Sequence, residues 1–169
     1  MTQMKKIGLL LITLISISGQ VIAKSWDLSH LQKKKIDTSF KCYMDGKYVT
    51  DVSSRQYGYV HNPRTIIGNY GIYNLNNQYL VALSPRYGKI GDTVKITLDT
   101  GVQLKVIIGD FKKQNETKLG WGMHKISNKR NCLLEFIVDS NKISKSILKT
   151  GDLSRIYPGQ IIRIENSNM

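Results

Sequence analysis

The sequence has few acidic residues, cysteines and prolines: 12 Asp and Glu stand against 25 Lys and Arg, with two cysteines and three prolines in 169 residues. Two cysteines exclude a small scaffold held together by many disulfide bonds. With 41% apolar and 22% charged residues, the chain is neither disordered nor collagen-like. Its length suits one domain with an ordinary hydrophobic core. These absences leave a small, basic, globular protein.

Long uncharged runs are also scarce, and the one at Ile7–Ile17 is shorter than the roughly 20 residues that span a membrane. Lys5 and Lys6 precede it, and the small-residue segment Val21–Ala23 follows. This order is typical of a secretory signal peptide over residues 1–23; an uncleaved anchor is the alternative. Removing it lowers the formal charge from +13 to +11, because the segment contains two lysines and no acidic residue. We therefore expect a secreted, extracytoplasmic protein of the periplasm or cell wall.

The positive charge favours binding to anionic partners such as a wall polymer. Alternatively, the basic residues only form an ordinary solvated surface. The basic residues are spread along the chain, without a helix-turn-helix or an RNA-binding motif. They also lack the interleaved aromatic residues of a groove for single-stranded nucleic acid. A nucleic-acid partner is therefore not expected.

The two cysteines, Cys42 and Cys132, form an even pair in a chain predicted to be exported. A disulfide between them would close a loop of about 90 residues. Alternatively, Cys132 is a buried thiol, because it begins an apolar run. Two cysteines and three scattered histidines do not resemble a zinc site. No metal and no cofactor are expected.

Residues 24–40 are polar and rich in lysine, which indicates a linker or a short helix. The pattern then becomes β-like. Asp45-Gly46 predicts a two-residue turn between the strands Lys41–Met44 and Lys47–Thr50. Residues 53–69 look irregular.

Short strands separated by turns follow, and one helix is expected at Lys142–Lys149. The expected strands are Gly71–Tyr73, Tyr79–Leu83, Thr93–Leu98, Val102–Ile108, Leu133–Val138 and Gln160–Ile164. This succession predicts an all-β barrel or sandwich.

Two carboxylates stand out, because no serine-histidine-aspartate motif, phosphate loop or HExxH motif occurs. Asp110 follows the apolar run Val106–Gly109, and Asp139 follows Leu134–Val138. Partial burial at the end of a strand raises the pKa of a carboxyl toward the range of a general acid. The two side chains would meet if their strands were neighbours; otherwise each caps a strand end or a turn.

Four segments together resemble the 3D domain, a family named for three aspartates and related to the catalytic barrel of membrane-bound lytic murein transglycosylase A. The segments are Tyr79–Pro85, Ile90–Thr93, Val106–Lys112 and Glu135–Asp139. They are also similar to a group of small exported or phage-associated bacterial proteins. The resemblance covers roughly residues 41–165.

The resemblance implies a six-stranded double-psi β-barrel over residues 78–165, with a short helix and a small N-terminal β extension at residues 41–77. It further implies a role on peptidoglycan or another anionic wall polymer. Two functions are open under this resemblance. One is lytic transglycosylase-like cleavage, in which a single carboxyl protonates the glycosidic oxygen and a 1,6-anhydro sugar forms. The other is a non-catalytic barrel that binds glycan or proteins at the wall.

The family pattern also suggests individual roles. Asp139 matches the last family aspartate and would be the acid/base, while Asp110 matches the middle one and would position it. Ser84 stands where the first aspartate is expected. Ser84, Lys112 and Trp121 are the candidate substrate-binding residues, with Trp121 either stacking on a sugar or packing in its own loop.

Overall fold

The computed structural model describes residues 23–112, 121–127 and 130–169, with no side-chain detail for 125–130. The predicted signal peptide lies outside the described residues, apart from Ala23. The elements are, in chain order, β1 (Lys24–Asp27), α1 (Ser29–Lys33), β2 (Lys41–Asp45), the 3₁₀ helix η1 (Gly46–Tyr48), α2 (Arg55–Val60), β3 (Ile66–Ile67), η2 (Asn69–Gly71), β4 (Tyr73–Leu75), β5 (Gln78–Leu83), η3 (Pro85–Tyr87), β6 (Thr93–Leu98), β7 (Gln103–Phe111), β8 (His124–Ser127), β9 (Arg130–Cys132), β10 (Leu134–Val138), α3 (Lys145–Thr150) and β11 (Ile161–Asn166).

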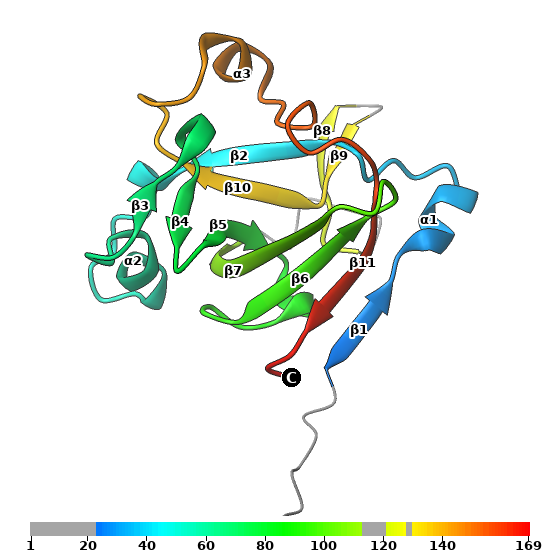
Figure 1. Ribbon diagram of the computed structural model, residues 1–169, viewed down its shortest axis with the longest axis horizontal. Helices are drawn as coiled ribbons and strands as arrows, with labels where there is room; N and C mark the ends of the chain where they lie inside the picture. The colour runs from blue at the N-terminus through cyan, green and yellow to red at the C-terminus, as the bar shows by residue number, and fades with distance from the viewer. Residues whose placement is uncertain (1–22, 113–120, 128–129) are drawn as a thin grey trace, which may run out of the picture.

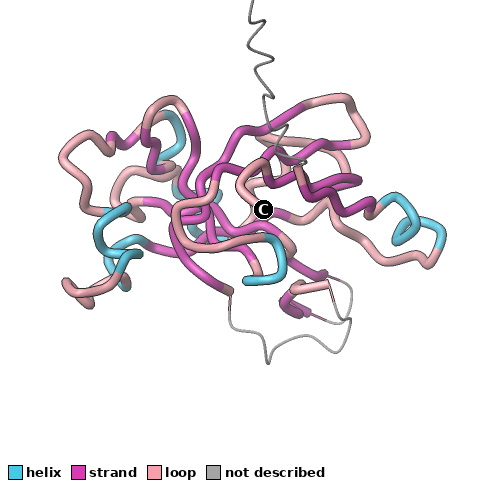
Figure 2. Tube along the Cα trace, turned by 90° about the horizontal axis from the view of Figure 1, so that it is seen from below, coloured by secondary structure: helices cyan, strands magenta, loops and turns pink. Residues whose placement is uncertain are grey.

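Most of these elements are strands of a single sheet, and the all-β fold class predicted from the sequence is confirmed. The sheet has the order β1-β11-β6-β7-β5-β10-β2, and β4 branches from β5 to carry β3. The pairs β5–β7 and β2–β10 are parallel, and the other pairs are antiparallel. The short helices lie at the periphery of the strands (Figures 1 and 2).

Strands form where apolar residues alternate with polar ones, as in β6, and also where the chain is apolar over several residues, as in β5 and β10. In β6, Val94, Ile96 and Leu98 are buried and the residues between them are partly exposed, as expected for a strand with one face on the core. The largest group of buried apolar side chains lies on this face, and a smaller one around Leu80 and Ile137 lies under η1 and α2. The sheet therefore has apolar residues on both faces.

Two of the short helices begin at serine caps. The Ser54 hydroxyl accepts a hydrogen bond from the Tyr57 amide at the start of α2, and Ser144 does the same for Ile147 at the start of α3. At the end of α3, Gly151 adopts a left-handed conformation with φ 66°, which a glycine tolerates without strain. No described helix is long and apolar enough to cross a membrane.

The structure differs from the predicted hairpin at Asp45-Gly46. β2 pairs in parallel with β10, while Gly46–Tyr48 forms η1. The Asp45 side chain caps η1 by accepting a hydrogen bond from the Lys47 amide at 3.0 Å, so the turn signal marks a helical turn. The apolar residues of Lys41–Met44 pack on the long-range neighbour β10, and this packing overrides the local pattern.

Two further segments are more ordered than their sequences suggest. Residues 24–40, expected to be a linker or a short helix, contain both β1 and α1, and Leu28 and Leu31 are fully buried. Residues 53–69, expected to be irregular, contain α2 and β3.

Side chains link the end strand β2 to β11, the strand next to the other end of the sheet. β1 and β2 are not paired with each other in the described residues, so the sheet is not a closed barrel. Lys41 in β2 is fully buried, and its ammonium donates hydrogen bonds to the Ser39 carbonyl at 2.8 Å and the Gly159 carbonyl at 2.6 Å. The Thr38 hydroxyl donates to the Ile161 carbonyl at the start of β11. These contacts hold β2 close to β11.

Candidate functional site

Asp110 lies near the end of β7, beside Ala82 of the parallel strand β5. The register shifts between Val81 and Ala82, so that Gly109 is an extra residue on β7. A Cβ on Gly109 would lie 2.9 Å from the end of the Ile137 side chain, which is closer than Cβ atoms normally approach. This irregularity sets the direction of the next residue, Asp110.

A cavity of about 230 Å³ opens to solvent beside the Asp110 carboxyl. Its walls come from η1, from the segment that follows it and from α2. They present the aromatic ring of Tyr48 together with the polar side chains of Thr50, Asp51, Ser54 and Gln56. Tyr48 is 71% exposed. Of the two predicted catalytic residues, Asp110 lines this cavity and Asp139 does not.

Glu135 lies on the other side of Ala82, in β10, and is the centre of an ion-pair cluster. One of its carboxylate oxygens, Oε1, is 2.7 Å from Lys112 Nζ and 2.7 Å from His124 Nδ1. Lys112 Nζ is 3.3 Å from His124 Nδ1. The Lys112 side chain is 2% exposed, compared with 12% for Glu135 and 26% for His124. The cluster is thus nearly closed to solvent, and His124 is its most accessible member.

The surroundings shift the pKa values of Asp110 and Glu135 in opposite directions. Burial raises the pKa of Asp110, and the negative charge of Glu135 adds to this; hydrogen bonds from the Phe111 amide and the Gln56 side chain reduce the shift. Burial alone would also raise the pKa of Glu135, but the hydrogen bonds and charges of His124 and Lys112 outweigh it and hold that pKa low. When the pKa values of two neighbouring carboxyl groups are shifted apart, one group can donate a proton while the other stays ionised.

Asp139 lies away from Asp110, because β5 separates β10 from β7, and of the two alternatives that the sequence left open the structure fits separate roles at a strand end and a turn. Asp110 and Glu135 are both level with Ala82, but β10 runs antiparallel to β5. Asp139 follows β10 and lies four residues beyond Glu135, which is about 13 Å along the strand. Its backbone N–H donates to the Gly71 carbonyl at 2.9 Å, and its carboxylate accepts from the Asn141 N–H at 2.9 Å. Asp139 therefore caps a turn at the opposite end of the strand.

The three predicted substrate-binding residues have packing roles. Ser84 is buried, accepts a hydrogen bond from the Arg86 amide, and lies against Gly122. Trp121 packs between His30, at a ring distance of 4.9 Å, and the Arg86 guanidinium, also at 4.9 Å. Lys112 is enclosed in the cluster with Glu135. None of the three lines the Asp110 cavity.

Cys42 and Cys132 are joined by a disulfide bond, which is one of the two alternatives that the sequence left open. The bond attaches β2 to β9, directly beside Glu135. The two sulfur atoms and a Glu135 oxygen lie within 4.8 Å of one another. Because the sulfurs are bonded to each other, they are not thiolate ligands for a metal ion.

Most members of this site were not predicted, neither the cavity wall around Asp110 nor the residues Gln56, His124 and Glu135 that act on the two carboxyl groups. The signal for Glu135 was its position as the single charged residue inside the apolar run Leu133–Val138. A charge in such a run is expected to have a partner. No comparable local signal marks Gln56 or His124, because both reach the site through long-range packing. Comparisons with protein-family models, curated proteins and solved structures found no match.

Proposed function

We propose that this protein is exported and associates with peptidoglycan, and that it binds glycan strands at the Asp110 cavity. The observation that carries this proposal is the chemistry of the cavity wall. Tyr48 offers an exposed ring, while Asp51, Gln56 and Asp110 offer planar hydrogen-bonding groups. Sugars have an apolar face that packs on aromatic rings and hydroxyl groups that bind carboxylates and amides.

Two features support export. The N-terminal residues have the pattern of a signal peptide. The bond between Cys42 and Cys132 is of the kind that persists outside the reducing cytoplasm. The positive charge of the remaining chain would increase the rate of encounter with an anionic wall polymer.

We further propose that the sheet is an opened form of the six-stranded double-psi β-barrel of the 3D domain. The barrel would be formed by six consecutive strands of the sheet, β11-β6-β7-β5-β10-β2. The two parallel pairs within it and the Lys41 and Thr38 contacts between β2 and β11 support this assignment. A structure with β2 and β11 hydrogen-bonded along their length would complete the barrel.

A second candidate function is cleavage of the glycan strand, with Asp110 in place of Asp139 as the acid/base. The raised pKa of Asp110 beside the low pKa of Glu135 favours it. In this reaction the Asp110 carboxyl protonates the glycosidic oxygen as the C1–O bond breaks. The 6-hydroxyl of the same sugar then bonds to C1 and returns its proton to Asp110. No second carboxylate nucleophile is needed, which differs from ordinary glycosidases.

Glycan binding is tested by sedimentation of the purified, oxidised protein with peptidoglycan sacculi. We expect Tyr48→Ala to weaken binding about tenfold, because it removes the aromatic face. Ile66→Ala is the matched control, since Ile66 is 61% exposed and lies outside the cavity lining. The assay is repeated in 0.5 M salt, which screens attraction due to net charge alone. Equal binding by the two variants, or complete loss of wild-type binding in salt, would contradict a cavity site.

Cleavage is tested by mass spectrometry of the soluble products from the same incubation. The second candidate predicts 1,6-anhydro muropeptides with the wild type and with Asp139→Asn, and none with Asp110→Asn. Products that disappear in Asp139→Asn but not in Asp110→Asn would instead support the assignment from family resemblance. Retention on sacculi without any product would reject cleavage and leave glycan binding.

A further inference from the structure

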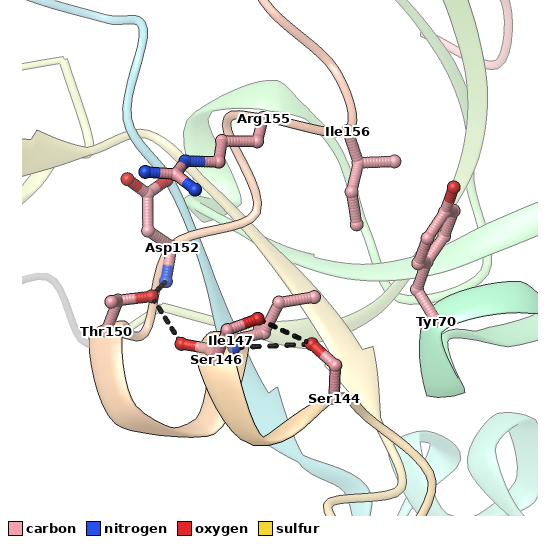
Figure 3. A pocket seen from close by; sticks show the side chains of 8 residues that line it. All are labelled: Tyr70, Ser144, Ser146, Ile147, Thr150, Asp152, Arg155 and Ile156. Carbon is pink, nitrogen blue, oxygen red and sulfur yellow. Dashed lines mark hydrogen bonds between the residues drawn. The ribbon is translucent and has the colours of Figure 1, made fainter.

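A larger cavity, of about 380 Å³, lies between η2 and the segment from α3 to Ile156. It is a different site from the Asp110 cavity, because α3 and α2 lie at separate edges of the molecule (Figure 1). Its volume is in the range of small-ligand sites. Figure 3 shows Tyr70 on one side of the opening, facing Ile156 and Ser144, with Arg155 and Asp152 at the far end.

The apolar part of the cavity is made by Tyr70, Ile147 and Ile156. Tyr70 is 52% exposed, which is high for a large aromatic residue. Its backbone has φ 61° and ψ 19°, a left-handed conformation that is uncommon for a tyrosine. Strain of this kind is frequently found where a side chain is held ready for a ligand.

The charged end of the cavity favours an anion. Arg155 is exposed, and within the described part of the chain it has no carboxylate within 4.0 Å. Lys145 and Lys149 of α3 add positive charge to the same region. Asp152 is the acidic residue of the lining, and one of its oxygens already accepts the Ser154 N–H at 2.7 Å.

A single carboxylate fits this end better than a phosphate does. The planar guanidinium of arginine binds a carboxylate through two parallel hydrogen bonds. The negative charge of Asp152 at the same end would repel a dianion more strongly than a monoanion. The hydroxyls of Ser144 and Thr150 already make hydrogen bonds with neighbouring groups of α3 and Asp152, and Arg155 is the cationic donor of the lining.

We propose that this cavity binds the C-terminal residue of a short peptide. The peptide carboxylate would bind Arg155, and the aliphatic side chain of the last residue would lie on Tyr70, Ile147 and Ile156. Peptidoglycan carries short peptides on its glycan strands, so the two cavities would bind two parts of one polymer. Only that last connection rests on the proposed glycan function; the preference for a peptide carboxylate does not.

The test is an NMR titration of the uniformly ¹⁵N-labelled, oxidised protein with N-acetyl-alanyl-alanine and with its C-terminal amide. We expect the free acid to shift the amide signals of Tyr70 and Arg155, and to bind at least about tenfold more tightly than the amide. Arg155→Gln is expected to bring the affinity for the acid down to that for the amide. Lys149→Gln is the matched control, because it removes a nearby charge outside the lining and is expected to change the affinity less than twofold.

Tyr70→Asn is a second variant, chosen because asparagine tolerates the left-handed backbone conformation and lacks the ring. It is expected to weaken binding of both the acid and the amide by the same factor. The proposal is overturned by equal affinity for the two peptides, by equal losses in Arg155→Gln and Lys149→Gln, or by shifts confined to other surfaces. Sacculus binding by Arg155→Gln separates the two sites, since the glycan proposal predicts that binding through Tyr48 persists in this variant.

Discussion

The Lys112 ammonium lies 2.7 Å from the Glu135 carboxylate, and the lysine side chain is almost fully withdrawn from solvent. Replacing Glu135 with glutamine removes the negative charge while keeping the shape of the side chain. We expect Glu135→Gln to reduce the free energy of unfolding by about 3 kcal/mol at pH 7, because it removes a carboxylate that compensates the buried Lys112 ammonium. Urea denaturation followed by tryptophan fluorescence measures the change.

The control is a double-mutant cycle with Lys112→Met. If the ion pair causes the loss, the double variant will be less destabilised than the sum of the two single variants, because their shared interaction is counted in both single variants. The effect of Glu135→Gln must also shrink in acid. The pKa of Glu135 is low in the folded protein, so its stabilising contribution is present above the unfolded pKa and is lost as the pH falls through the folded pKa. Additive losses at every pH would disprove a coupled pair.

Asp110 and Glu135 are also coupled by their negative charges across Ala82. We expect the pKa of Asp110, measured from the ¹³C shift of its carboxyl, to lie above the usual value of 3.8 and to fall in Glu135→Gln. For such a raised pKa, the stabilising contribution of Asp110 is present below its unfolded pKa and is lost as the pH rises through its folded pKa. Asp139→Asn serves as the control and should leave the pKa of Asp110 unchanged. An Asp110 pKa that does not respond to Glu135→Gln contradicts the coupling.

The sequence predicts this fold well where strands have a local pattern. The alternation of buried and exposed residues in Thr93–Leu98 and the apolar runs at Tyr79–Leu83 and Leu133–Val138 each lead to a strand close to the expected bounds. Which strands pair with each other, however, is decided by contacts between segments that lie far apart in the chain. The turn signal at Asp45-Gly46 is therefore misleading, because β2 finds its partner in β10, about 90 residues further on.

The candidate site was predictable only in part for the same reason. Asp110 has a local signal, since a carboxyl at the end of a buried strand is expected to be partly desolvated. The same signal at Asp139 is misleading, because strand direction decides which end of the sheet each carboxyl occupies. The cavity wall comes from η1 and α2, and α2 reaches Asp110 only through its packing on β7.

The disulfide between Cys42 and Cys132 joins residues 90 positions apart and ties the edge strand β2 to β9. We expect Cys42→Ala combined with Cys132→Ala to lower the free energy of unfolding by about 4–5 kcal/mol, because a long loop of the unfolded chain is no longer closed. Thermal unfolding of the wild type with and without a reducing agent, beside the double variant, measures this loss. The variant itself is the control for the reductant, which should not affect it. A double variant as stable as the oxidised wild type would contradict the prediction.

Lys41 is fully buried between β2 and the segment before β11, and its ammonium contacts two backbone carbonyls. Burial lowers the pKa of Lys41 to about 8, while the charges of Asp37, Asp99 and Asp152 act in the opposite direction. The folded protein therefore binds fewer protons at Lys41 than the unfolded chain does between about pH 8 and the ordinary pKa of 10.5. Stability must rise with pH wherever the unfolded state binds more protons.

We therefore expect the wild type to gain stability relative to Lys41→Met as the pH is raised from 7.5 to 10.5. The gain is at most about 3 kcal/mol, which corresponds to the full difference between the two pKa values. Urea denaturation of both proteins at each pH measures it, and comparing them cancels the titration of tyrosines common to both. Lys105→Met is a second control, because it replaces an exposed lysine of β7 instead of a buried one. If the difference in stability between wild type and Lys41→Met is flat or falls with pH, the pKa of Lys41 is not lowered in the folded protein.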